Sequence, residues 1–182
     1  IQNPRIQPFY RLLYDTTRQA AEKDLLTGEI PAGGWCHSLY FTPRVLEAGL
    51  LYALTGEKWA VDHVARQIAK LERVYADPPH SFYREIKPFK GKPSAYFSCV
   101  HTALAVQLCR EALDPVLVAR FLALTHARLL EDRVNCPYVF THFNAAHNAV
   151  VTHAISTAIT ALIFGAEAGH PPAILARQHA NR

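Results

Sequence analysis

Three polar side chains open one predicted helix in the C-terminal part of the sequence. Asn144, His147 and Asn148 are spaced i, i+3 and i+4, so a helix places them on one face. Amide and imidazole N–H groups at a helix N-terminus meet the positive end of the helix dipole, which suits an anionic group. The pattern predicts a clamp for a carboxylate or a hydroxyl. The alternative that these residues leave open is helix capping by Asn144, with His147 and Asn148 bonded to solvent or to neighbouring loops.

A row of hydroxyl side chains continues this face further along the same helix. Thr152, Ser156 and Thr160 follow Asn148 in steps of four residues, within a segment rich in Ala, Val, Ile and Leu. Hydroxyls in such helices bond to backbone carbonyls one turn earlier, where helices pack closely. We therefore interpret this row as a packing surface and place the candidate site at the start of the helix.

The sequence predicts neither a metal site nor a cofactor site. His147 and His153 are six residues apart, so they lie on different helix faces, and no Asp or Glu is near them. No H-E-x-x-H motif occurs, and the four Cys residues form no C-x-x-C pair, which favours buried free thiols. Ser98 and His101 are spaced i, i+3, but no G-x-S-x-G turn surrounds the serine, so we expect this pair to be structural.

The long connections between the predicted helices carry further candidate residues. These connections are rich in Gly, Pro and aromatic residues, which is typical of segments that pack over a site. Each aromatic ring taken alone is also explained by ordinary packing. Taken together with the cluster at Asn144, they resemble the lining of a sugar site, where rings stack and amides bond hydroxyls. The expected substrate-binding residues are Trp35, Tyr83, Arg84, Tyr138 and His142.

The elements that must position these residues are predicted to be helices. Apolar residues recur at helical spacing, whereas alternating strand patterns are poor. Tight and long connections alternate, which predicts antiparallel hairpins in one all-α domain, 1–182. Helices are expected at 9–26, 44–54, 57–75, from the cap Ser94, from the cap Asp114 with Pro115, and at 144–168. Their expected apolar stripes include Val61, Val64, Ile68, Leu71 and Val74, then Phe97, Val100, Leu104 and Leu108, then Val118, Phe121, Thr125 and Leu129.

Composition narrows the class of protein. Half of the 182 residues are hydrophobic and 19% are charged, which is ordinary for a globular domain. The net charge is +4 with scattered basic residues, so we expect no nucleic-acid partner. The uncharged stretch 149–166 carries His and several hydroxyls and lacks an aromatic belt, so we expect a buried helix and no membrane span. The chain begins at Ile1 and contains no Met, and we expect it to be processed or a fragment of a longer chain.

Two segments resemble the helical domain of polysaccharide lyases of the heparinase II/III and alginate lyase type. The segment Leu50-Leu51-Tyr52-Ala53-Leu54-Thr55-Gly56-Glu57-Lys58-Trp59-Ala60 is similar to the hairpin in which these lyases join two helices at a Thr-Gly-acidic turn. Asn144-Ala145-Ala146-His147-Asn148 resembles the family's Asn/His-bearing helix start, often written with adjacent Asn-Asn-His, although two alanines separate Asn144 from His147 here. The resemblance extends from Pro43 to Arg182.

The resemblance implies an incomplete α/α toroid of helical hairpins, followed by β-sandwich domains, and β-elimination of uronate-containing polysaccharides. In that reaction Asn, His or Arg neutralises the substrate carboxylate, and Tyr or His carries the protons. His147 with Asn144 or Asn148 would be the neutralising or base group, and the family's catalytic Tyr would follow Arg182. The implied partner is an anionic polysaccharide or oligosaccharide, met in the periplasm or outside the cell. The alternatives are a glycosidase or sugar epimerase on the same scaffold, or a non-catalytic helical binding scaffold.

Overall fold

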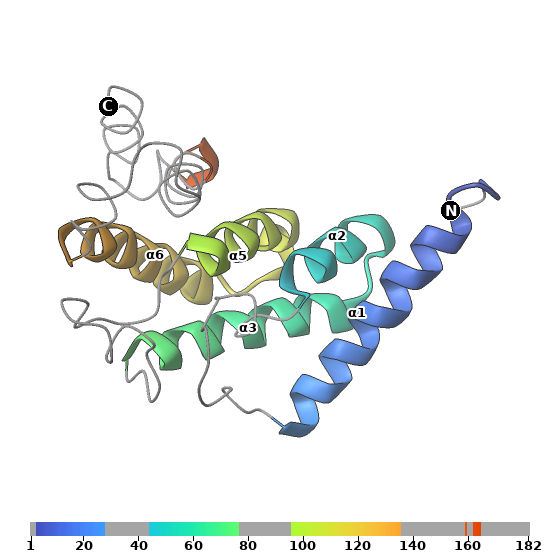
Figure 1. The fold of residues 1–182 in the computed structure, drawn as a ribbon, viewed down its shortest axis with the longest axis horizontal. Coiled ribbons are helices and arrows are strands. Elements are labelled where there is room, and N and C mark those ends of the chain that lie inside the picture. The colour runs from blue at the N-terminus through green and yellow to red at the C-terminus, as the bar shows by residue number, and fades with distance from the viewer. Residues whose placement is uncertain (1–2, 28–43, 77–95, 136–158, 160–161, 165–182) are drawn as a thin grey trace.

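The computed structural model of this protein describes residues 3–27, 44–76, 96–135, 159 and 162–164 (Figure 1). Throughout these residues the secondary structure is helical, with no strand, so the predicted all-α fold class is confirmed. In chain order the elements are α1 (Gln7–Thr27), α2 (Val45–Thr55), α3 (Lys58–Ala76), α5 (Tyr96–Cys109), the 3₁₀ turn η2 (Arg110–Ala112) and α6 (Pro115–Asn135). Residues 159 and 162–164 are also helical, within the helix predicted at 144–168.

The predicted start of α6 is confirmed. The Oδ1 atom of Asp114 accepts a hydrogen bond from the backbone N–H of Val116 at 2.8 Å, and Pro115 occupies the first helical position. The aspartate satisfies one of the free N–H groups at the helix start, and the proline needs no partner for its nitrogen.

A tight turn joins α2 to α3. Gly56 ends α2 in the left-handed conformation with φ of 72°, and its N–H donates to the Tyr52 carbonyl at 2.7 Å. The Thr55 hydroxyl donates to the Leu51 carbonyl at 2.8 Å and accepts from the Glu57 N–H at 3.2 Å. The glycine therefore closes the tight joint expected between the helices predicted at 44–54 and 57–75.

Replacing Gly56 with Ala is expected to lower the free energy of unfolding by about 1–2 kcal/mol, because a residue with a Cβ atom is strained in the left-handed conformation. A Cβ atom on Gly56 would meet nothing within 4 Å, so conformational strain is the expected cause. Equilibrium unfolding in urea measures the loss. Gly56→Asn is the matched control and should cost less, because Asn tolerates this conformation; equal losses for Ala and Asn would contradict the explanation.

The hydrophobic core lies between α2, α3, α5 and α6, with Phe164 added from the helical residues 162–164. Most of the predicted stripe of α3 is buried, and so is the stripe of α6 as far as the structure describes it. The buried residues of these two predicted stripes are Val61, Val64, Ile68 and Leu71, then Val118, Phe121 and Thr125.

The predicted apolar stripe of α5 is wrong in part. Leu108 is 37% exposed, and the buried side of α5 instead carries small residues, including Thr102, Ala105 and Cys109. The reason is the close crossing of α2 and α5: a Cβ atom on Gly49 would lie 2.7 Å from the Cα atom of Ala105. Small side chains allow this approach, and larger ones are displaced to the edges of the contact. Cys109 is a free thiol, as predicted, and burial raises its pKa to about 12, so it stays protonated and unreactive.

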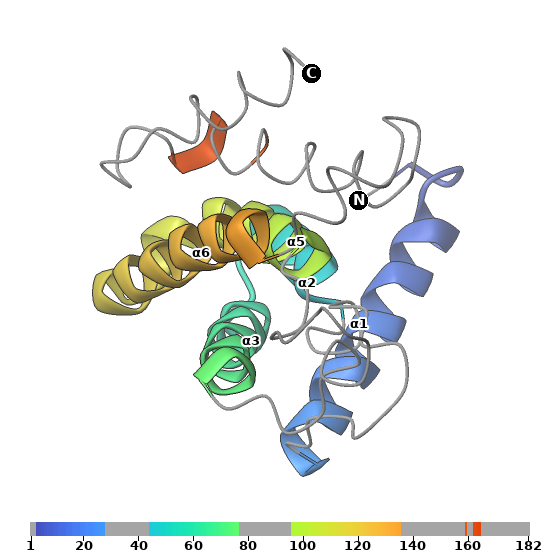
Figure 2. The same cartoon turned by 60° about the vertical axis from the view of Figure 1, so that its left-hand side comes forward.

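The first helix packs against α2 and α3 (Figure 2). Its contacts show that α1 and α3 run in the same direction: Tyr14 bonds to Glu57 just before α3, and Asp24 bonds to Lys70 in the last third of α3. The end of α1 therefore lies beside the second half of α3.

Candidate functional site

The residues proposed from the sequence as catalytic or substrate-binding lie outside the described part of the chain. They therefore stay predictions, and the structure neither brings them together nor separates them. These residues are Asn144, His147, Asn148, Trp35, Tyr83, Arg84, Tyr138 and His142.

The directions of the helices show on which side of the bundle the segments that contain these residues are attached. In Figure 1, α2 and α5 run to the right of the view, whereas α3 and α6 run to the left. The joint 56–57 consequently lies at the right of the view, whereas the joint 110–114 lies nearer its middle, because Arg120 in the second turn of α6 pairs with Glu72 near the end of α3 at 3.0 Å. The end of α1, the start of α2, the end of α3, the start of α5 and the end of α6 are joined to the segments 28–43, 77–95 and 136 onward. We call this side of the bundle the long-connection end.

Three polar residues lie at the long-connection end, where α2 and α5 begin. Arg44 precedes α2 and forms an ion pair with Glu47 in its first turn, with Nη1 and Oε1 2.9 Å apart. His101 stands one turn before Ala105, which packs on Gly49, and the charge of Glu47 acts on it. Arg44 has φ of 55°, a left-handed conformation that costs a non-glycine residue roughly 1–2 kcal/mol.

The environment of His101 keeps its imidazole neutral. Burial lowers the pKa of His101 below its usual value of 6.5, although the negative charge of Glu47 acts in the opposite direction. A neutral imidazole at pH 7 can accept a proton, and the exposed Arg44 guanidinium can bind a carboxylate. The sequence singled out His101 only as a structural partner of Ser98; its position beside α2 depends on a tertiary contact that no spacing reveals.

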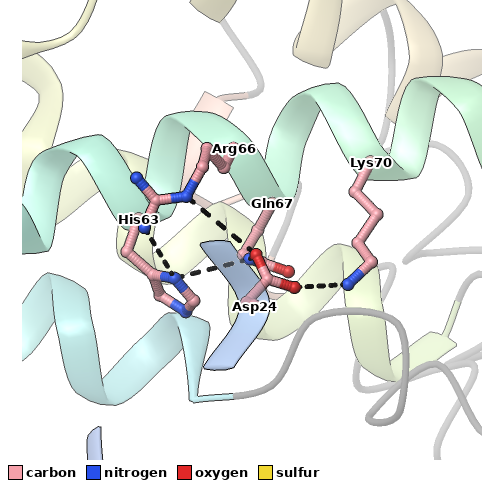
Figure 3. A network of polar contacts seen from close by, with 5 residues as sticks. All are labelled: Asp24, His63, Arg66, Gln67 and Lys70. Atoms are coloured by element: carbon pink, nitrogen blue, oxygen red, sulfur yellow. Dashed lines mark hydrogen bonds and ion pairs between the residues drawn. The ribbon is translucent and has the colours of Figure 1, made fainter. Parts of the chain in front are cut away.

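A second polar cluster joins the end of α1 to α3 (Figure 3). The Asp24 carboxylate accepts hydrogen bonds from the Lys70 ammonium and, at 2.7 Å, from the Gln67 amide. The Nε atom of Arg66 lies 4.0 Å from Asp24, and the Nδ1 atom of His63 lies 3.5 Å from Gln67. The side chains of Asp24 and Lys70 are 8% and 5% exposed, so this is a buried ion pair.

The contacts of this cluster favour a structural role, in which it holds α1 against α3. Burial by itself raises the pKa of Asp24, but the hydrogen bond and the charge of Lys70, with the amide of Gln67, outweigh burial and lower the pKa below 3.8. A carboxylate with a lowered pKa and two fixed donors is a poor proton acceptor. We therefore interpret Asp24 as the anchor of α1. The sequence offered no signal for it, because the bonded residues are 43 and 46 positions apart.

The described residues show neither a metal-binding cluster nor a membrane-spanning helix. They contain no group of three or more His, Cys, Asp or Glu side chains arranged to hold a metal ion. Among the helices of that part of the chain, none combines the length and the apolar character that crossing a membrane requires. The stretch 149–166, for which the sequence predicts a buried helix and no membrane span, lies largely outside the described residues.

Comparison with known proteins adds no relative. No protein-family model, no curated protein and no solved structure matches this chain.

Proposed function

We propose that this chain forms the helical part of a polysaccharide lyase, which cleaves an anionic, uronate-containing glycan by β-elimination. The observation that supports the proposal is that the long connections all leave from helix ends facing the same side of a bundle of helical hairpins, away from the joint 56–57. The segments that contain the predicted substrate-binding residues all attach there, so they can converge on one ligand. Long segments positioned by a rigid scaffold are the usual location of binding and catalytic residues.

The predicted helix start at Asn144 is compatible with the same end. Phe164 packs against Phe121 of α6, and the Arg110 guanidinium, just after α5, lies 5.9 Å from the centre of the Phe164 ring. The sequence predicts a helix that begins at Asn144 and passes through Phe164. At about 1.5 Å per residue such a helix spans about 30 Å, which is long enough to reach from Phe164 to the long-connection end.

The chemistry of β-elimination explains why this set of residues is relevant. The proton to be removed is weakly acidic and lies next to a carboxylate, so donors that neutralise the carboxylate stabilise the enolate-like transition state. His147 with Asn144 or Asn148 would supply such donors. Arg44 adds a cation at the long-connection end, and the neutral imidazole of His101 adds a proton acceptor.

The lyase reaction has a specific readout, because it leaves an unsaturated uronate that absorbs in the ultraviolet. We expect the protein to produce this absorbance on a panel of polyuronates. Reducing ends released without absorbance would replace the lyase with a glycosidase. Glycan binding with neither signal would replace it with a sugar epimerase or a non-catalytic scaffold, and a test for epimerised sugar separates those two.

Replacing His147 with Ala is expected to lower the lyase rate by roughly 10²–10⁴-fold, the usual contribution of a positioned acid or base. Initial rates of absorbance increase measure the effect, and an unchanged unfolding midpoint excludes loss of the fold. Gln107→Ala, on an exposed position of α5, is the matched control and should leave the rate unchanged. Full activity of the His147→Ala protein would remove His147 from the site.

A further inference from the structure

The first helix is attached to the rest of the protein by a polar surface. Among its described residues, only Thr17 and Ala21 are buried as whole residues, at 0% and 3% exposure, and the Asp24 side chain is buried through its ion pair. None of them belongs to the contiguous hydrophobic core, and none is among the partly buried apolar residues packed against it. A helix that belongs to a core normally buries a stripe of large apolar residues, so α1 is attached differently from α2, α3, α5 and α6.

Hydrogen bonds, charges and a ring contact replace that stripe. Tyr14 donates to the Glu57 carboxylate at 2.7 Å, and the Arg18 guanidinium lies 4.9 Å from the centre of the Trp59 ring. Arg18 also forms an exposed ion pair with Glu22 of its own helix. Contacts of this kind near the surface contribute little each. The buried ion pair of Asp24 is therefore the strongest single contact of α1.

Three large apolar residues at the start of α1 are exposed, whereas Leu13 is half-buried. Ile6, just before the helix, is 50% exposed, and Phe9 and Leu12 are 72% and 64% exposed. These side chains gain almost nothing from docking, since water still reaches them. The surface of α3 beneath α1 includes the Trp59 ring, which meets the Tyr14 ring edge to face, and the polar residues Gln67 and Lys70, which water can solvate when the helix leaves.

We propose that α1 is a detachable helix, which undocks as a unit from α2 and α3 while the body of α2, α3, α5 and α6 stays folded, and that the Asp24–Lys70 pair is the contact that holds it in place. Undocking uncovers polar groups and leaves the hydrophobic core intact, so it requires less free energy than global unfolding. Once separated, a helix of 21 residues is only marginally stable in water, and its amides become open to exchange.

Amide hydrogen exchange of the intact chain, followed by mass spectrometry, tests the proposal. In the wild-type protein the amides of α1 should exchange faster than those of α5 and α6, through an opening that leaves the latter protected. Lys70→Ala leaves Asp24 buried without its cation, and it should speed exchange in α1 by roughly 100-fold or more while α5 and α6 change little.

Two control variants separate undocking from general destabilisation. Lys58→Ala removes an exposed ion pair with Asp62, 2.6 Å long, and should not change exchange in α1. Val106→Ala opens a cavity in the core and should speed exchange in α5 but not in α1, because undocking already sets the rate there. Equal protection of α1 and α5 in the wild type, or acceleration of all helices together by Lys70→Ala, would overturn the proposal.

Discussion

Replacing Phe121 with Ala is expected to lower the free energy of unfolding by about 3–5 kcal/mol, the usual cost of deleting a buried aromatic ring. Phe121 is fully buried at 0% exposure, and its ring packs edge to face on Phe164 with centroids 6.3 Å apart and planes at 74°. The substitution removes both the buried area and this ring contact. Equilibrium unfolding in guanidinium chloride measures the loss.

Variants of the ring partner Phe164 and of the exposed residue Val116 are the controls for the Phe121 result. Val116→Ala changes an apolar residue of the same helix that is 63% exposed, and it should alter stability by no more than about 0.5 kcal/mol. Phe164→Ala should be strongly destabilising as well, and the double variant should show a coupling of about 0.5–1.5 kcal/mol between the rings. No loss from Phe164→Ala would show that residues 162–164 are not part of the core.

Substituting Leu for Gly49 should lower the free energy of unfolding by about 2–3 kcal/mol, although helix propensity alone favours Leu by about 0.8 kcal/mol. The first added atom would lie 2.7 Å from the Ala105 Cα and 3.2 Å from the Ala105 carbonyl oxygen. Backbone atoms cannot rotate away as a side chain can, so α2 and α5 must separate. Thermal or urea unfolding measures the effect.

Variants at neighbouring positions distinguish this clash from a general intolerance of α2 to change. Ala53→Leu adds a side chain to an exposed position one turn further along the same helix and should be nearly neutral. Gly49→Ala should be intermediate. Adding Ala105→Gly to Gly49→Ala should restore part of the loss, since the 3.0 Å contact with the Ala105 Cβ disappears while the backbone contacts remain. A Gly49→Leu protein as stable as the wild type would show that the two helices are not in close contact.

Local features of the sequence were sufficient to place the helices. Asp114 and Pro115 mark the start of α6, Gly56 marks the end of α2, and the buried residues of α3 follow the predicted spacing. These signals act over a few residues: a cap bonds to N–H groups in the next turn, and an apolar stripe depends only on the period of the helix. The all-α class follows from them.

The candidate site is divided between what the sequence predicts and what the structure adds. The polar face at Asn144 and His147, and the residues of the long segments, are predictions from residue type and spacing, and they lie outside the described residues. The tertiary structure adds the common end to which those segments attach, and it adds His101 beside Glu47. No local pattern marks His101, because its neighbour belongs to another helix.

Contacts between distant helices were decided only by the tertiary structure. The buried face of α5 carries Ala105 and not Leu108, because Gly49 of α2 lets the two backbones approach. Asp24 meets Lys70 across 46 positions, and its pairing turns the polar side of α1 inward while Phe9 and Leu12 face water. The sequence by itself determined where the helices are, since helix formation is local. Which helix faces pack together depends on whether surfaces far apart in the chain fit each other. That fit is visible only in the folded structure.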